Sequence, residues 1–188
     1  MKPQALANVV TGIAAFLLLL SASLLAAQSH DSAAISKLLT QVKNHAALAN
    51  EDAVTLESFT RSGVHWSTHA AQLNQMRQHV NNLITDANQM SSLRDEGSPW
   101  QQEAIDRISP LLPVIASHLR ATIDHLNQNH KQIRMQPYSD YVRANEKLIN
   151  QAYQLIVHYE SYAQAMARVN ALDKEFQPAI SSGKTMQP

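Results

Sequence analysis

The sequence contains no cysteine, and only four of its 188 residues are glycine. The absence of cysteine excludes disulfides, thiol catalysis, thiolate metal sites and covalent attachment of a c-type haem. The scarcity of glycine excludes glycine-rich phosphate-binding loops, and no Gly-x-Ser-x-Gly, His-Glu-x-x-His or Glu-x-x-His motif occurs. The sequence therefore predicts a protein without catalytic activity, stabilised by packing alone.

Charge is also scarce, and it is balanced. Fifteen Lys and Arg residues face fifteen Asp and Glu residues, and charged side chains make up 16% of the chain. No run of five like charges appears, so the sequence predicts no nucleic-acid partner.

The first 29 residues have the pattern of a secretory signal peptide. Lys2 and the terminal amine precede an uncharged apolar segment at residues 9–27, and small residues follow it. We expect cleavage after Ser29, with cleavage after Ala27 as the alternative. Nineteen apolar residues in a helix also reach roughly 28 Å, close to the thickness of a bilayer core, so an uncleaved membrane anchor is the competing interpretation. Either way, residues 30–188 are predicted to be exported to the periplasm or secreted.

The exported part carries apolar residues at helical spacing, in four stretches separated by short polar or glycine-containing junctions. This pattern predicts helices near residues 32–61, 65–92, 99–133 and 138–175 and no strand. The first three apolar stripes run Ile35, Leu39, Val42, Ala46, Ala49, Ala53, Leu56; Trp66, His69, Leu73, Met76, Val80, Leu83, Ala87, Met90; and Ile105, Ile108, Leu112, Ile115, Leu119, Thr122, Leu126, Asn129, Ile133. The fourth runs Tyr141, Asn145, Leu148, Ala152, Leu155, Tyr159, Tyr162, Met166, Val169.

The junctions between these stretches are short, which makes neighbouring helices antiparallel. The predicted fold class is all-α: an antiparallel up-down-up-down four-helix bundle at residues 30–176, preceded by the N-terminal signal or hydrophobic helix and followed by a flexible tail at residues 177–188. Ser98 and Pro99 are predicted to start the third helix, and Pro178 to follow the end of the fourth. Pro110 and Pro113 interrupt the third stretch, where we favour a kink over a loop because the apolar register continues across them.

Histidine supplies the sharpest hypothesis for a site. His65 and His69 are four residues apart, so on a helix they share one face, a spacing that suits zinc or copper. In an antiparallel bundle His130 comes to the same end, which suggests a metal or haem site built from His65, His69 and His130. The simpler interpretation is that these histidines belong to the ordinary packing of the bundle, and no cofactor is then expected.

Together these patterns predict an exported helical bundle with a non-catalytic binding, scaffolding or structural role in the cell envelope or outside the cell. A protein partner is expected, and the membrane is involved only through residues 9–27 if they remain attached. The alternatives are the metal- or haem-binding bundle and a membrane-tethered, sensor-like extracytoplasmic domain. The sequence leaves the ligand, the partner and the oligomeric state open.

Overall fold

The computed structural model describes the backbone of residues 31–182 and the side chains of residues 31–176. The chain divides into two units, Met1–His30 and Asp31–Pro188. The predicted signal segment, its cleavage site and residues 183–188 of the predicted tail lie outside the described residues. No helix in residues 31–182 is both long and apolar enough to cross a membrane.

The described residues form α-helices joined by short connections, as predicted. They are α2 (Ala33–Thr60), α3 (Trp66–Ser92), α4 (Pro99–Ile108), α5 (Leu111–Gln128) and α6 (Gln136–Ser182). Two short 3₁₀ turns, η1 (Arg94–Glu96) and η2 (His130–Gln132), complete the connections. The all-α prediction is confirmed for this part of the chain, which contains no strand.

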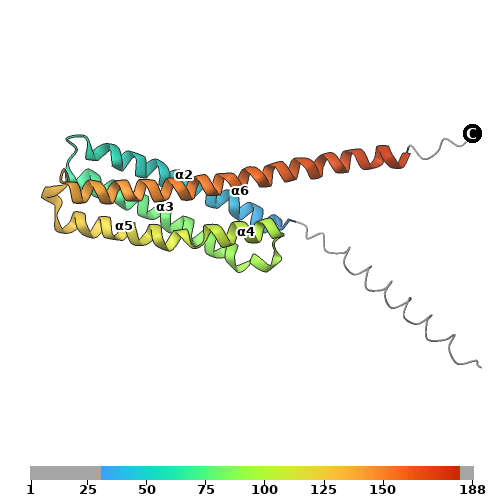
Figure 1. The fold of residues 1–188 in the computed structure, drawn as a ribbon, viewed down its shortest axis with the longest axis horizontal. Coiled ribbons are helices and arrows are strands. Elements are labelled where there is room, and N and C mark those ends of the chain that lie inside the picture. The colour runs from blue at the N-terminus through green and yellow to red at the C-terminus, as the bar shows by residue number, and fades with distance from the viewer. Residues whose placement is uncertain (1–30, 183–188) are drawn as a thin grey trace, which may run out of the picture. The chain divides into compact units, whose positions relative to one another are not determined.

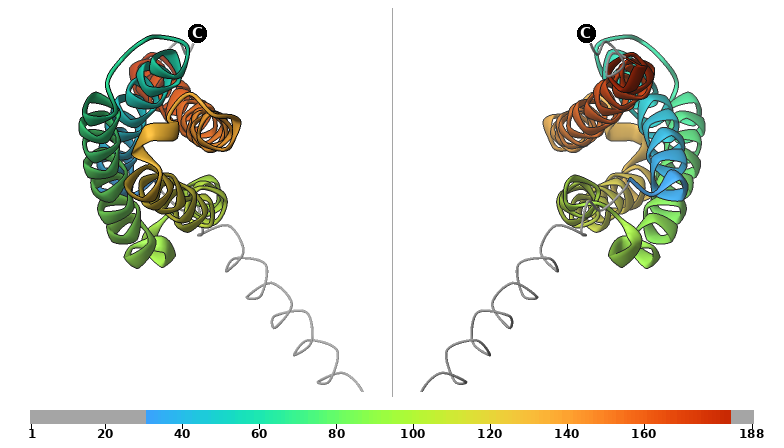
Figure 2. Two further views of the ribbon diagram at one scale, coloured as in Figure 1. Left: turned by 90° about the vertical axis from the view of Figure 1, so that its left-hand side faces the viewer. Right: turned by 90° about the vertical axis from the view of Figure 1, so that its right-hand side faces the viewer.

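The helices form four antiparallel rods, with α4 and α5 together making the third (Figure 1). Viewed along the rods, α2 lies between α3 and α6, and α4 with α5 completes the ring (Figure 2). A single hydrophobic core runs along the inside of this ring, with residues from every helix. Consecutive rods are therefore neighbours in space, which is the arrangement that short connections favour.

The core confirms the predicted stripes of the first three helices, except that Trp66 is exposed and Asn129 and Ile133 are only partly buried, but it does not confirm that of α6. All seven predicted positions of α2 are buried. In the first half of α6 the buried face is instead formed by Tyr138, Val142, Asn145, Ile149, Ala152, Ile156 and Tyr159. Tyr141 is exposed, while Leu148 and Leu155 are only partly buried. Apart from the shared Asn145, Ala152 and Tyr159, the predicted stripe was therefore wrong, because α6 is apolar on two adjacent faces.

The third rod is interrupted at Ser109 and Pro110 without forming a loop, and the predicted continuation of the rod across this point is confirmed. The two residues separate α4 from α5, but their dihedral angles, φ −56° and ψ −40° for Ser109 and φ −68° and ψ −20° for Pro110, remain right-handed helical. The amide of Ser109 still donates to the carbonyl of Ile105 at 3.0 Å. Proline removes one helical donor without turning the chain away from the rod. Helix α5 ends at Gln128, five residues before the predicted end at 133.

Two His–Asp pairs join α2 to α3. His79 of α3 contacts the buried carboxylate of Asp52 on α2, with Nδ1 and Oδ2 2.6 Å apart. Seven residues earlier on α2 and seven residues later on α3 the order is reversed, because His45 belongs to α2 and Asp86 to α3, with Nε2 and Oδ2 3.5 Å apart. These pairs place polar contacts at two levels of an otherwise apolar interface.

A buried glutamine links the start of α4 to the start of α2. Gln101, fully buried at the start of α4, accepts hydrogen bonds at Oε1 from the amides of Ser32 and Ser98, at 2.8 and 3.0 Å. Its Nε2 donates to the carbonyl of Ser32 and to Oγ of Ser36. The predicted helix start at Ser98 and Pro99 is confirmed, and Gln101 additionally ties it to the start of α2.

Helix α6 is longer than predicted. It continues through Pro178 to Ser182, so the prediction that the helix ends near 175 was wrong. Its C-terminal part extends beyond the end of the bundle at which α2 and α4 begin (Figure 1). The apolar residues Val169, Leu172 and Phe176 are consequently exposed.

Candidate functional site

A pocket of about 540 Å³ opens at the end of the bundle where the α2–α3 and α5–α6 connections meet. It is lined by Gly63, Val64, His65, Trp66, His130, Lys131, Ile133, Arg134 and Met135. The lining comes from two short connections, and it includes two of the three histidines proposed from the sequence as metal ligands. We call it the loop-end pocket.

His65 lies at the edge of this pocket as the N-cap of α3, outside the helix itself. Its backbone is extended, with φ −71° and ψ 148°, and its Nδ1 accepts from the amide of Ser67 at 3.4 Å. Nδ1 also lies 2.8 Å from Oγ of Ser67. Because His65 has non-helical dihedral angles, the four-residue spacing to His69 does not place the two imidazoles on one helical face.

Trp66 forms the aromatic part of the pocket. Its indole contacts the imidazoles of His65 and His130, with ring centroids 5.6 and 5.3 Å apart. The Trp66 side chain is 39% exposed, which is high for a residue of this size. A flat apolar ring is therefore accessible at the pocket, where it is available for stacking.

The loop-end pocket is electrostatically positive. Lys131 and Arg134 line it, and none of the described residues that line it is Asp or Glu. It also adjoins the N-terminus of α3, a 27-residue helix whose dipole directs positive potential toward this end. These features together favour a bound anion.

His69 is directed into the core. Its Nδ1 lies 3.1 Å from the hydroxyl of Tyr138, and its ring meets Phe59 edge to face. Its Nε2 is buried and has no hydrogen-bond partner. Burial lowers the pKa of His69 and raises that of Tyr138. The imidazole is therefore held in its neutral form inside the bundle.

The structure thus brings together two of the three proposed ligands and assigns the third to packing. His65 and His130 share the loop-end pocket, whereas His69 is bonded to Tyr138. Within residues 31–176, no three His, Cys, Asp or Glu side chains are grouped in a way that suits a metal ion. The metal site at His65, His69 and His130 stays a prediction.

Sequence reasoning missed Lys131 and Arg134. Both lie in the connection between α5 and α6, where helical periodicity carries no information about which way a side chain points. The signal was the basic composition of the short segment that follows the last apolar position of the third stretch, residues 130–134.

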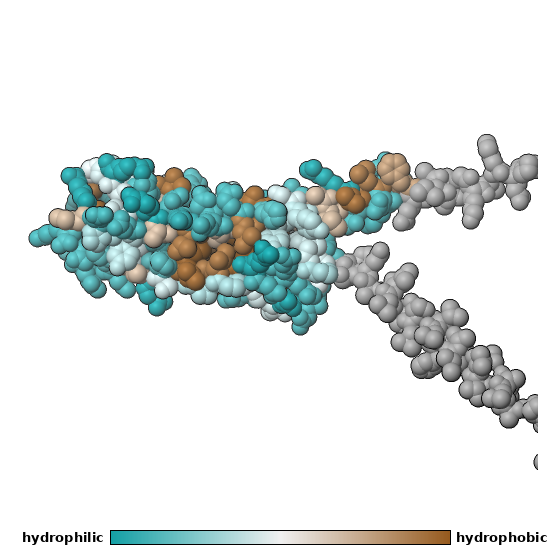
Figure 3. Space-filling model, in the orientation of Figure 1, coloured by the Kyte–Doolittle hydropathy of each residue, from teal (hydrophilic) through white to brown (hydrophobic). Residues whose placement is uncertain are grey.

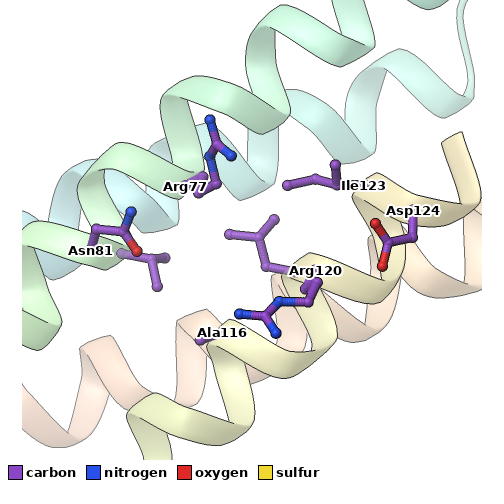
Figure 4. A pocket seen from close by; sticks show the side chains of 8 residues that line it. Arg77, Asn81, Ala116, Arg120, Ile123 and Asp124 are labelled. Atoms are coloured by element: carbon purple, nitrogen blue, oxygen red, sulfur yellow. The ribbon is translucent and has the colours of Figure 1, made fainter. Parts of the chain in front are cut away.

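A second pocket, of about 420 Å³, lies between α3 and α5 (Figure 4). Arg77 and Asn81 line it from α3, and Arg120 and Asp124 line it from α5. Two arginines line this space, but the Asp124 carboxylate opposes their charge. The loop-end pocket is the better candidate for an anion because its lining has no such carboxylate and offers an exposed indole.

Comparison with family models, with curated proteins and with solved structures gives no match for this chain. The site is therefore interpreted from its own chemistry.

Proposed function

We propose that this protein is an exported, non-catalytic binding protein whose loop-end pocket binds a small anionic ligand that carries an aromatic ring. The observation that carries this proposal is the combination of Lys131 and Arg134 with the exposed indole of Trp66 in one pocket. The cations neutralise the anionic group, and the indole stacks on the ring.

The proposal that the protein is exported depends on its N-terminal segment. A short positive start, an uncharged apolar segment at residues 9–27 and a small-residue exit together support a signal peptide that is removed after Ser29. The protein then acts in the periplasm or outside the cell. The intact mass of the exported protein tests this part, since removal of residues 1–29 gives one defined loss of mass.

The ligand proposal is tested by tryptophan fluorescence. The chain has two tryptophans, so Trp100→Phe leaves Trp66 as the only reporter. We expect phenyl phosphate to change the Trp66 emission with a saturable curve, and inorganic phosphate to bind more weakly because it lacks a ring. Affinity for both should fall as salt is raised, since charge provides part of the attraction.

Reversing the charge of the two basic residues in the pocket tests whether they bind the anionic group. Lys131→Glu combined with Arg134→Glu should reduce the affinity for phenyl phosphate at least tenfold. The matched control, Lys37→Glu combined with Arg143→Glu, makes the same change of charge at exposed positions that do not line the pocket. Equal loss in both double variants, or no saturable change in the parent, would reject the anion site.

Metal binding is the second candidate function, favoured by the shared position of His65 and His130 in the pocket. Zinc or copper titration of the untagged protein tests it. Stabilisation by metal that is lost in His65→Gln and His130→Gln, but kept in His79→Gln, would support it. An unchanged melting temperature would contradict it.

The remaining alternative is a tethered, sensor-like domain facing the extracytoplasmic side. It requires residues 9–27 to stay attached. An intact mass that includes residues 1–29, with the protein in the membrane fraction, would favour this alternative over the secreted form.

A further inference from the structure

The part of α6 at and beyond the end of the bundle carries an apolar stripe that the other described residues leave largely exposed. Tyr162, Val169, Leu172 and Phe176 are between 43% and 60% exposed, and Met166 is partly exposed. At 100° per residue these five side chains fall within about 120° of the helix circumference. Figure 3 shows apolar surface on the projecting helix. Phe176 is the most exposed large apolar side chain among residues 31–176.

The stripe continues into a pocket on the bundle. This pocket, of about 290 Å³, is lined from α6 by Leu155, His158, Tyr159 and Tyr162, and from α4 by Trp100, Glu103 and Arg107. By the same helical geometry, the four α6 residues lie on the face that carries the stripe. Trp100 meets Tyr162 edge to face, with ring centroids 5.3 Å apart. An aromatic pocket therefore lies at the point where the free stripe reaches the bundle.

We propose that this surface binds a second copy of the chain, with two α6 helices packed antiparallel about a two-fold axis at Val169. This axis sets Phe176 of each copy opposite Tyr162 of the other, because both lie seven residues from Val169. It also sets Met166 opposite Leu172. The stripe is thus complementary to itself, and Phe176 of each copy enters the pocket beside Trp100 of the other.

Charge favours a second copy over a membrane surface. Between residues 161 and 176 the charged side chains are Arg168, Asp173, Lys174 and Glu175, with a net charge of zero. A helix that lies on anionic lipid needs an excess of Lys and Arg on its polar face, which this segment lacks. On the helix, Arg168 and Glu175 lie on the same side of the stripe. In the antiparallel pair, this side of one copy lies next to the same side of the other copy. Arg168 then lies within about one and a half turns of Glu175 of the other copy.

The contact is limited to one helix segment and one pocket from each copy, at the lower end of specific interfaces. We therefore expect dimerisation that depends on concentration in the micromolar range. Sedimentation velocity between about 1 and 200 μM, on the protein as the producing cell leaves it, should show a shift from monomer to dimer.

A matched pair of substitutions locates the interface. Val169→Asp should weaken the dimer at least tenfold. Val54→Asp makes the same change on α2, at a position with nearly the same exposure, 49% against 51%, and should leave the dimer unchanged. Circular dichroism of both variants checks that the fold is retained, as expected for exposed positions.

The absence of cysteine allows the orientation to be tested by crosslinking. Val169→Cys should form a disulfide with itself under mild oxidation, because the two-fold axis brings the two residues 169 together. Phe176→Cys should not pair with itself, but it should pair with Tyr162→Cys when the two variants are mixed.

Three results would overturn the proposed antiparallel dimer. A protein that remains monomeric at 200 μM, with no crosslink through Val169→Cys, overturns the proposal. Self-crosslinking of Val169→Cys and Phe176→Cys at equal rates indicates a parallel pair and overturns it as well. A dimer that Val169→Asp does not weaken also overturns it, because another surface then forms the interface.

Discussion

The Nδ1 atom of His79 lies 2.6 Å from Oδ2 of Asp52, a carboxylate whose side chain is only 5% exposed between α2 and α3. Oδ1 of the same carboxylate accepts hydrogen bonds from the side-chain amides of Gln72 and Gln75, at 2.8 and 2.9 Å. Burial raises the pKa of Asp52, although the hydrogen bond and the charge of His79 oppose the shift. One buried carboxylate on α2 thus accepts from two glutamine amides of α3 and contacts a histidine of the same helix.

Replacing this acceptor should destabilise the bundle. Asp52→Ala leaves the two glutamine amides and His79 without their partner, so we expect a loss of about 2–4 kcal/mol in the free energy of unfolding. Asp52→Asn keeps one acceptor oxygen and should lose less. Urea unfolding at neutral pH measures both. Asp95→Ala, at a carboxylate that is 98% exposed, is the control and should change stability by under about 0.5 kcal/mol. Equal effects at the two sites would show that the Asp52 contacts contribute nothing.

His69 should make the protein less stable in mild acid. Burial lowers its folded pKa below the ordinary value of 6.5, so the unfolded chain binds a proton at a pH where the folded chain does not. Its contribution to stability is therefore complete above about pH 6.5 and decreases as the pH falls below that value. The loss is at most about 1.4 kcal/mol per pH unit for one group.

Urea unfolding at pH 7.5 and at pH 5.5 measures the free energy of unfolding of His69→Gln and of the parent protein. The two proteins differ at this one position, so the comparison isolates the effect of His69. The variant should lose less stability than the parent on acidification. His130→Gln, at an exposed position, should behave like the parent. An identical pH dependence in all three proteins would contradict the role assigned to His69.

Gly97 should not tolerate a methyl group, although its φ of −83° is open to any residue. A Cβ there would lie 2.9 Å from Cδ1 of Ile35 and 3.2 Å from Cβ of Gln101. We expect Gly97→Ala to lose about 1–3 kcal/mol through overpacking. At Gly63 the nearest atom to an added Cβ is the flexible Nη2 of Arg134, at 3.3 Å. Gly63→Ala should therefore be neutral or slightly stabilising. Thermal unfolding of the two variants side by side tests the contrast, which disappears if the Gly97 turn is able to relax.

Gln101 should anchor the start of α2. Gln101→Ala removes four hydrogen bonds, two of them to the backbone of Ser32, and leaves buried donors and acceptors without partners. We expect a loss of about 2–4 kcal/mol and faster hydrogen exchange at the first amides of α2. Gln41→Ala, at an exposed position about two turns into α2, is the matched control and should change neither quantity. Normal protection of the α2 start in Gln101→Ala would show that Ser32 holds the helix by itself.

The helices and most of the core were predictable because burial and helical period agree in α2 and α3. In α2, the 3-4 spacing from Ile35 to Leu56 leaves only one apolar face. In α6, by contrast, the face of Leu148 and Leu155 and that of Ile149 and Ile156 are both apolar. The spacing of the apolar residues does not show which of the two faces is buried. The positions of the neighbouring helices decide which face is buried.

The site was less predictable for two physical reasons. A shift of one residue in the start of α3 changes His65 from a helical residue to an N-cap, and it removes the shared face with His69. The buried role of Asp52 depends on the register between α2 and α3, which brings Gln72, Gln75 and His79 to its level. A pattern within one helix contains no information about that register.

The crossed order of the two His–Asp pairs has a consequence for the alignment of α2 and α3. Sliding one helix by seven residues would keep apolar side chains against apolar side chains, so hydrophobic packing alone discriminates poorly between the alignments. One such slide would bring His45 level with His79, and the opposite slide would bring Asp52 level with Asp86. Each displaced alignment would therefore place like groups against each other, and only the observed alignment pairs each of these two aspartates with a histidine.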